Sequence, residues 1–514
     1  MPKLLSSLAI LYLLVLVRSH GKTKIPENNY AISIHDLGKL IDYEHYLLGI
    51  LQNFSNALQQ RVDAIEYYLN MTEYEEERKL PDDPFRAFRI TRRLHSDYLN
   101  WMWLMEQQPW ETLVKHITAI APQMPTSKDI EEASSGLRLI QWTYSLPTAQ
   151  MARGVLQSIH HKYAPSTSLD AMQCLTMARH MVNHKDFSRA KEWLMEGLKM
   201  HEADEENEFY YSQLGTPLAD FYELFVRILD ELGTRFLAMT ELQLAIKNWP
   251  EEVSLQRAHS RLKMNIRIGK EPAKTKEKKT QGAYRNCCST ECRPTAKLHC
   301  LYNTTASHFL RLAPLKMELL SLDPYVVLFH DVVSDQDILS IRNLAKGGLA
   351  RAVTVTQDGN DKEDPARTTK GTWLVENSKL IQRLSQLSQD MTNFDVRDAD
   401  PFQVLNYGIG GFYGTHFDFL EDTEMGHFSD RIATAVFYLS DVPQGGATTF
   451  PDLGLSVFPE KGAALLWYNL DHKGVGDNRT AHSACPTIVG SRWVMTKWIN
   501  EREQLFRRPC LTSI

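Results

Sequence analysis

One stretch near the N-terminus restricts the folds open to this chain more than any other feature. Eleven positions there follow one another at alternating spacings of three and four residues, and nine are apolar: Ile34, Leu37, Ile41, Glu44, Leu48, Leu51, Ser55, Leu58, Val62, Ile65 and Leu69. A heptad pattern of this length predicts one long helix with a coiled-coil seam. The alternative is a single amphipathic helix inside a bundle. Helical patterning continues beyond it, so we expect an all-α dimerisation domain over residues 27–160.

Residues 165–262 predict a second helical domain, because they contain two similar pairs of helices. Small residues stand where the helices of each pair would cross, namely Ala178, Ala190 and Gly197, then Ala238 and Ala245. This pattern predicts a tetratricopeptide-like α-repeat domain that presents a concave surface to extended peptides. A plain helical bundle is the alternative, since the first pair lacks the closing proline.

The first 19 residues predict a secretory signal peptide. Lys3 precedes an uncharged run from Leu4 to Val17, and Ser19 is a suitable cleavage position. A membrane anchor would need about 18–20 apolar residues, so this run is too short to be one. No later stretch of the sequence is long and apolar enough to span a membrane. Sequons at Asn53, Asn70, Asn303 and Asn478 fit glycosylation in the same route. The formal charge of −6 excludes a strongly basic nucleic-acid binder.

Residues 263–318 predict a linker with a cysteine cluster. A lysine-rich segment is followed at once by Cys287, Cys288, Cys292 and Cys300. Their spacing allows a zinc site, but a local disulfide to Cys300 suits a secreted chain better. Seven cysteines are an odd number, so at least one is unpaired. We expect this to be Cys174, as a buried thiol on a repeat helix.

From residue 319 to residue 514 the sequence predicts a β-rich domain with a barrel or jelly-roll architecture. Short alternating or apolar runs such as PYVVLFHDVV and RIATAVFYLSDV are bounded by Gly, Pro and Asp. Helices are expected near residues 336–345 and 377–391. The fold class is therefore multidomain α + β, with a coiled-coil or bundle, an α-repeat domain and a C-terminal double-stranded β-helix.

Three His-x-Asp sequences occur, and only His416-Phe417-Asp418 lies in a strand context after turn glycines. On a strand, residues i and i+2 project from one face, so this imidazole and carboxylate can share a metal. A second histidine would complete a site with open positions for a co-substrate and O2. His482 and, ten residues later, Arg492 are candidates for this histidine and for a cation that grips a dicarboxylate.

These segments resemble the α subunit of collagen prolyl 4-hydroxylase, an Fe(II)- and 2-oxoglutarate-dependent dioxygenase. The resemblance is densest in QVLNYGIGGFYGTHFDF, RIATAVFYLSDVPQGGATTFP, KGAALLWYNL, HSACPTIVGSRWVMTKWI and the terminal RRPC. It extends over the chain after the signal peptide. The heptad region resembles that family's dimerisation domain, and the repeats resemble its peptide-substrate-binding domain.

The resemblance implies a procollagen-proline 4-dioxygenase that hydroxylates proline in Gly-X-Y sequences. It would decarboxylate 2-oxoglutarate to succinate and CO2, with L-ascorbate as a further cofactor. By position, His416, Asp418 and His482 would be the iron ligands. Arg492, where the family usually has Lys, and Tyr407 would bind 2-oxoglutarate.

Four further residues resemble those that hold the peptide near the metal: Tyr413, Arg431, Trp498 and, more weakly, Asp400. Taken by themselves, the two aromatic residues are also compatible with barrel lining, and Arg431 with a surface salt bridge. The resemblance also implies two disulfides, Cys485 with Cys510 and Cys288 with Cys300, with Cys287 or Cys292 as substitutes.

By resemblance, the chain would join protein disulfide isomerase as β subunit in an α2β2 tetramer in the lumen of the endoplasmic reticulum. The terminal Leu-Thr-Ser-Ile is no retention signal, so a partner would supply retention. The second repeat reads DFYELFVRILDELG, in which Tyr222 is the only tyrosine, whereas the family's groove is tyrosine-rich. Two alternatives follow, a hydroxylase of proline or another residue in a non-collagen secreted protein and a non-catalytic collagen-binding subunit.

Overall fold

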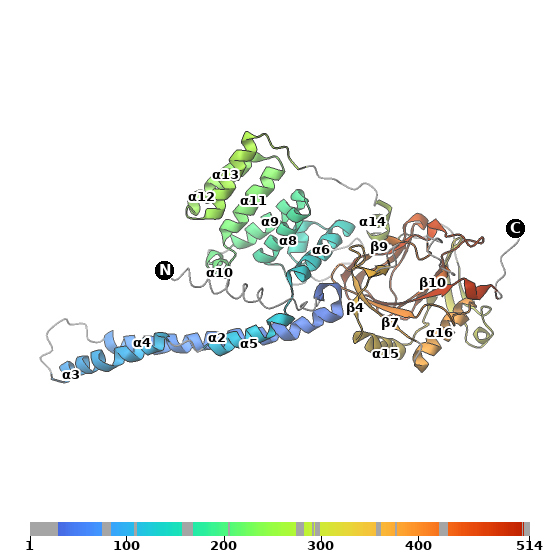
Figure 1. Cartoon of the computed structure of the whole chain (residues 1–514), viewed down its shortest axis with the longest axis horizontal. Coiled ribbons are helices and arrows are strands. Elements are labelled where there is room, and N and C mark those ends of the chain that lie inside the picture. Colours follow the sequence, from blue (N-terminus) through green and yellow to red (C-terminus); the bar gives the residue numbers. More distant parts are fainter. Residues whose placement is uncertain are drawn as a thin grey trace. The chain divides into compact units, whose positions relative to one another are not determined.

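The structure of the chain is a computed structural model. It describes residues 29–73, 84–106, 110–156, 168–203, 206–273, 282–289, 292, 299–355, 361–375, 378–420, 430–505 and 507. Helices come first and a sheet-rich region follows, which confirms the predicted order (Figure 1). The predicted signal peptide and Cys510 lie outside the described residues. In the described ranges, no helix has both the length and the apolar character needed to cross a membrane.

The chain divides into two compact units, and the described part of the first is residues 37–73, 84–106 and 110–126. Its helices are α2 (Ile34–Glu73, whose first turn belongs to the second unit), α3 (Pro84–Arg92), α4 (Tyr98–Glu106) and α5 (Glu111–Ile120). The 40-residue α2 confirms the long helix predicted from the heptads. Ring centroids lie 4.8 Å apart between Tyr68 and Trp101 and 5.6 Å apart between Phe54 and Trp110. The chain after α2 therefore runs back along it.

The second unit contains residues 29–36 and the chain from residue 127 onward. Its helices before the sheets are α6 (Ser127–Tyr144), α7 (Thr148–Ala152), α8 (Ala171–Asn183), α9 (Phe187–His201), α10 (Asn207–Gln213), α11 (Leu218–Glu231), α12 (Arg235–Asn248), α13 (Val253–Arg267) and α14 (Gly282–Ser289). Asp170 caps α8 through a capping box with Gln173. The two helical pairs predicted from the sequence correspond to α8 with α9 and α11 with α12.

Small residues let these helices approach one another. Ala178, Ala190, Ala238 and Ala245 are fully buried. A Cβ atom added at Gly197 would lie only 3.1 Å from the Cβ of Cys174. Cys174 itself is buried and carries no disulfide, as predicted, and burial raises the pKa of its thiol to about 12.

The C-terminal region contains antiparallel sheets. The largest has nine strands in the order β1 (Cys300–Asn303), β2 (Leu315–Leu322), β3 (Tyr325–His330), β14 (Ala464–Tyr468), β10 (Arg431–Tyr438), β17 (Trp493–Asn500), β8 (Phe402–Tyr407), β7 (Thr369–Leu374) and β4 (Ala350–Arg351). A four-stranded sheet has the order β13 (Leu455–Val457), β12 (Thr448–Phe450), β15 (His482–Ala484) and β9 (Tyr413–His416). Short two-stranded sheets pair β11 (Gln444–Gly445) with β16 (Thr487–Val489), and β5 (Thr354–Val355) with β6 (Asp361–Lys362).

Alternation along the central strands gives the large sheet two buried faces. On β10, Ala435 and Phe437 pack in a core with α15 (Asp335–Lys346) and α16 (Lys379–Thr392). These two helices lie close to the sequence positions at which helices were predicted. The intervening Val436 and Tyr438 pack instead against β12 and β13 of the smaller sheet. This layering, two facing antiparallel sheets with helices on the outer face, fits the predicted jelly-roll. The second face, between the sheets, is where the functional site lies.

The segment before α2 is buried against the end of β8. The backbone N–H of Ile409 donates to the Ala31 carbonyl at 3.0 Å, and a Cβ atom at Gly408 would overlap that carbonyl. The fully buried side chain of Asn406 accepts from Ser33 Oγ at 2.7 Å and from the N–H of His35 at 3.1 Å. Residues 29–36 therefore belong to the packing of the sheet-rich region, which the heptad pattern did not predict.

Both predicted disulfide pairings are wrong. Cys288 of α14 bonds Cys485, which follows β15, so neither of these two cysteines has the partner expected for it. The two cysteines are 197 residues apart, and sequence alone cannot give such connectivity. Among the described residues, the cysteines form no group suited to zinc.

Three of the four sequon asparagines, Asn53, Asn70 and Asn478, are exposed. Asn303 is only 9% exposed, and its Oδ1 accepts from the N–H groups of Thr305 and Ala306. This burial disfavours Asn303 as a glycosylation site in the folded chain.

Candidate metal and co-substrate site

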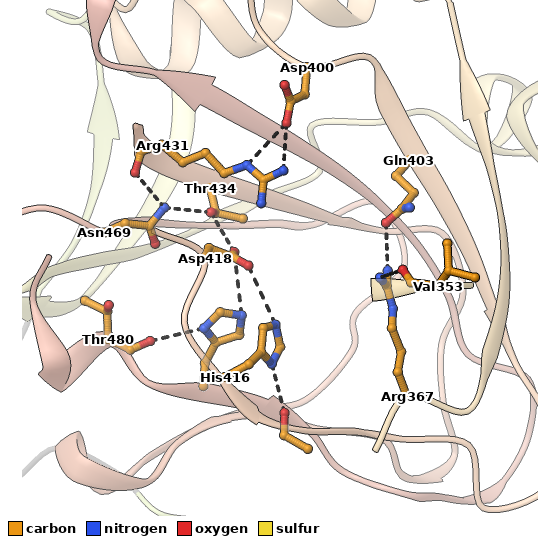
Figure 2. Close-up of polar contacts among 12 residues, drawn as sticks. Val353, Arg367, Asp400, Gln403, His416, Asp418, Arg431, Thr434, Asn469 and Thr480 are labelled. Atoms are coloured by element: carbon orange, nitrogen blue, oxygen red, sulfur yellow. Dashed lines mark hydrogen bonds and ion pairs between the residues drawn. The ribbon is translucent and has the colours of Figure 1, made fainter. Parts of the chain in front are cut away.

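The smaller sheet brings two histidines together. His416 at the end of β9 lies opposite His482 at the start of β15 in the antiparallel register, with ring centroids 4.3 Å apart. Asp418 follows β9, and its carboxylate oxygens lie 3.6 Å from each Nε2 atom. Figure 2 shows the imidazole of His416 turned toward this carboxylate. The candidate donor atoms all lie within 4.8 Å of one another, so three residues predicted from the sequence converge.

Backbone carbonyls fix the proton positions on both imidazoles. Nδ1 of His416 lies 2.8 Å from the Gly414 carbonyl, and Nδ1 of His482 lies 3.1 Å from the Thr480 carbonyl. Since a carbonyl only accepts, each Nδ1 must carry the proton and donate it. Each Nε2 then has its lone pair directed toward Asp418, which is the tautomer that a metal ligand requires.

Burial and neighbouring charges favour the unprotonated forms of His416 and Asp418. Burial, reinforced by His482, lowers the pKa of His416 to about 3. Burial alone would raise the pKa of Asp418, but the two imidazoles, Arg431 and a hydrogen bond from Thr434 outweigh it and lower that pKa. A neutral imidazole and a carboxylate at neutral pH are what a divalent cation binds.

Arg492 lines the pocket that contains these three residues. It is 2% exposed, its Nη2 donates to Thr448 Oγ1 at 3.0 Å, and its guanidinium lies 4.7 Å from the centre of the Tyr407 ring. Within the described residues, its Nε and Nη1 atoms have no hydrogen-bond partner. A buried guanidinium with two unsatisfied N–H groups is costly unless an anion binds them.

The pocket encloses about 450 Å³, open mouth included. Asp418, Arg367 and Arg492 are its charged lining residues, and Trp467 and Thr448 also line it. With neutral imidazoles, the lining carries a net charge of +1 from two arginines and one carboxylate. Metal binding would make it more positive, which suits a dianionic ligand.

Residues predicted to hold the peptide lie in two places. Tyr413 lines the pocket and stacks on His416 at 3.6 Å between centroids. Trp498 lines it too, and its Nε1 has no partner among the described atoms. Arg431 lies 4.4 Å from the centre of the Trp498 ring and pairs with Asp400 at 3.0 Å (Figure 2). Arg431 thus forms a salt bridge, as its alternative interpretation expected, and it also lies beside Trp498 of the pocket.

Three polar residues at the site, Arg367, Thr434 and Asn469, were not predicted from the sequence. Arg367 donates to Gln403 Oε1 at 2.8 Å and to the Val353 carbonyl at 3.1 Å, as Figure 2 shows. Thr434 Oγ1 donates to Asp418 Oδ2 at 2.7 Å and accepts from Asn469 Nδ2 at 2.9 Å. A polar residue inside an apolar strand such as RIATAVFY was the available hint.

Two family models match the chain. Residues 33–158 match the N-terminal region of prolyl 4-hydroxylase α subunits, and residues 402–500 match the 2OG-Fe(II) oxygenase superfamily. Prolyl 4-hydroxylase subunit alpha-2 of Gallus gallus is 30% identical over 94% of this chain and 95% of its own length. Subunit alpha-1 of Homo sapiens is 30% identical over 94% and 96%. This chain belongs to the prolyl 4-hydroxylase α-subunit family.

Membership in this family confirms the resemblance seen in the sequence motifs and makes the chain a dioxygenase. Among solved structures, a viral collagen prolyl hydroxylase from Paramecium bursaria Chlorella virus 1 covers 34% of this chain at 22% identity. Its TM-score of 0.30 is too low to establish a shared fold.

The oxygenase family implies Fe(II) and 2-oxoglutarate, and the residues present fit both. Two imidazoles and one carboxylate are the donor set of non-haem Fe(II) oxygenases. The unsatisfied N–H groups of Arg492 suit a carboxylate of 2-oxoglutarate.

Proposed function

We propose that this chain is the catalytic α subunit of a procollagen-proline 4-dioxygenase. His416, Asp418 and His482 would hold Fe(II), and Arg492 with Tyr407 would hold 2-oxoglutarate. The observation that carries the proposal is the guanidinium of Arg492, buried and incompletely hydrogen-bonded in the pocket of the His-Asp-His cluster. Bound iron and 2-oxoglutarate would supply the oxidising chemistry, giving succinate, CO2 and 4-hydroxyproline.

The chain's own residues orient these groups. The Gly414 and Thr480 carbonyls hold the imidazole protons on Nδ1, away from the metal position. Thr434 holds the Asp418 carboxylate, and the apolar ring of Trp467, 4.6 Å from the His482 ring, helps to exclude water. Because these contacts hold the donor atoms in place, little reorganisation is needed at the moment of reaction.

The peptide substrate would enter beside Tyr413 and Trp498. Both are aromatic, and the unpaired Nε1 of Trp498 offers a donor to a peptide carbonyl. Arg431 would act on this wall through its contact with Trp498. Hydroxylation at the Y position of Gly-X-Y sequences would then favour the collagen triple helix.

The helices of residues 165–262 would form a tetratricopeptide-like domain that binds the peptide away from the metal. Tyr222 lies 5.7 Å from Trp249, and this pair presents aromatic surface suited to proline rings. Tyr222 remains the only tyrosine of α11, which favours a second candidate, hydroxylation of a non-collagen secreted protein.

Self-association would use the heptad positions of α2 as a coiled coil. Ile41, Leu48 and Leu51 are 54%, 55% and 56% exposed, and burial of such a row against a second copy would be favourable. The tetramer would add protein disulfide isomerase as β subunit, which would keep the chain in the endoplasmic reticulum. L-Ascorbate would serve as reductant after uncoupled turnover.

The test is release of labelled CO2 from 2-oxoglutarate by the chain co-expressed with protein disulfide isomerase. A repeating Pro-Pro-Gly peptide, the same length of Gly-Ala-Ala repeat and no peptide form the three arms, and His416→Ala is the control. Release that depends on the proline peptide and on His416 supports the proposal. Iron binding without release in any arm would instead favour the non-catalytic alternative.

A further inference from the structure

Cys287 and Cys292 lie close to each other beside the Cys288–Cys485 disulfide. Cys287 lies on α14, directly before the disulfide-bonded Cys288, and Cys292 follows the helix by three residues. The two Sγ atoms are 2.7 Å apart, closer than the contact distance of unbonded sulfur atoms. Adjacent residues on a helix point about 100° apart, so Cys287 and Cys288 face different partners.

One residue of the smaller sheet holds the backbone of both cysteines. Ser456, at the centre of β13, donates from Oγ to the Cys287 carbonyl at 2.7 Å. The backbone N–H of Ser456 donates to the Cys292 carbonyl at 3.0 Å. The two cysteines are therefore fixed side by side by the same residue, independently of any attraction between their thiols.

We propose that Cys287 and Cys292 form a second disulfide, which ties α14 to the segment that follows it, where Ser456 holds both against the sheet that carries both histidines. The bond needs a disulfide donor, for example oxidised glutathione. The thiolate of the more exposed Cys292 attacks the donor and releases one donor thiol. Cys287 then loses its proton, attacks Cys292 Sγ and releases the second donor thiol, so two protein thiols are oxidised and one donor disulfide is reduced.

The location gives this bond a structural role. The side chain of Arg285 on α14 donates to Ser145 Oγ at 2.7 Å and lies 4.8 Å from the centre of the Trp142 ring. Helix α14 therefore joins the end of α6 to the smaller sheet. The Cys288–Cys485 bridge shows that thiols in this region are oxidised. A disulfide donor of the kind that forms this bridge would also form the second bond.

Peptide mapping tests the proposal on the full chain produced through the secretory route. Thiols are alkylated under denaturing, non-reducing conditions and the chain is digested with trypsin. Cys287, Cys288 and Cys292 then lie on one peptide, residues 286–297, and Cys485 on another, residues 480–492. The expected result is peptide 286–297 without any alkyl group on Cys287 or Cys292.

Two variants keep the assignment clear. In Cys292→Ser, Cys287 should become alkylated, which adds one alkyl group. In Cys288→Ser, peptide 286–297 should stay unalkylated and two hydrogens lighter than its dithiol, because the pair lies within the peptide. Alkylation of Cys287 or Cys292 in the unmodified chain, or a link from either to another peptide, would overturn the proposal, whatever partner Cys288 has.

Discussion

Thr434 offers a sharp test of how the site holds its metal. Its hydroxyl donates to Asp418 Oδ2 at 2.7 Å, and both side chains are buried, at 0% and 6% exposure. The same hydroxyl accepts from Asn469 Nδ2 at 2.9 Å. Thr434→Val keeps the shape of the side chain and removes both contacts.

The expected magnitude follows from two independent estimates. A buried hydrogen bond to a charged group contributes about 1.5–3 kcal/mol. Loss of a partner that orients a metal ligand typically costs about 10–100-fold in metal affinity, which is about 1.4–2.8 kcal/mol. Thr434→Val should therefore weaken metal binding about 10–100-fold.

The assay is anaerobic calorimetric titration of the purified complex with Co(II) as a redox-stable substitute for Fe(II). Thr434→Ser, which keeps the hydroxyl, should bind nearly as the parent chain does. Thr449→Val is the matched control, because that buried hydroxyl pairs with Ser483 at 2.8 Å rather than with Asp418. A folded Thr434→Val that binds Co(II) as tightly as the parent chain would refute the reasoning.

Three further predictions concern the co-substrate, the N-terminal segment and acid stability. Arg492→Met should raise the KM for 2-oxoglutarate about 10–150-fold, because the charged hydrogen bonds to the co-substrate are lost. Arg492→Lys keeps the positive charge and should raise this KM less. An unchanged KM in Arg492→Met would exclude Arg492 as the anchor of 2-oxoglutarate. Ser33→Ala should raise the KM for 2-oxoglutarate about 5-fold and leave the KM for the peptide unchanged. The reason is that Ser33 holds Asn406, which donates to the Arg492 carbonyl at 3.3 Å. A KM for 2-oxoglutarate equal to that of the parent chain in steady-state kinetics would contradict this. Burial, with His184 and Arg138 nearby, lowers the pKa of His180 to about 4 in the folded chain. As the pH falls below about 6.5, the unfolded chain therefore takes up a proton at His180 before the folded chain does. The folded state loses stability between about pH 6.5 and 4 for this reason. Thermal melts at pH 7.5 and 5 should therefore show a smaller fall in Tm for His180→Gln than for the parent chain, and an equal fall would contradict the assignment.

The metal cluster could be predicted because its signal is local. His416 ends β9 and Asp418 follows it by two residues, and His482 begins a strand-turn-strand unit, so the short spacing by itself brings His416 and Asp418 together. The long helix α2 was predictable for the same reason, since a heptad period is a property of neighbouring residues.

Features that depend on distant pairing were not predictable. Asn469 reaches Thr434, the residue that holds Asp418, only because β14 lies beside β10, a register that no spacing in the sequence encodes. The Cys288–Cys485 bridge joins residues 197 apart, and a cysteine count leaves many connectivities open. The sequon at Asn303 likewise gave no sign that its asparagine would be buried, because burial depends on the strand that pairs with it.

The most direct test of the central claim is to count product atoms. The chain in complex with protein disulfide isomerase is incubated with Fe(II), 2-oxoglutarate, O2 and a repeating Pro-Pro-Gly peptide, and 4-hydroxyproline and succinate are quantified in the same sample. We predict 4-hydroxyproline and succinate in equal amounts after subtraction of peptide-free succinate, and neither product with His416→Ala. Succinate without 4-hydroxyproline, or 4-hydroxyproline formed by His416→Ala, would contradict the account.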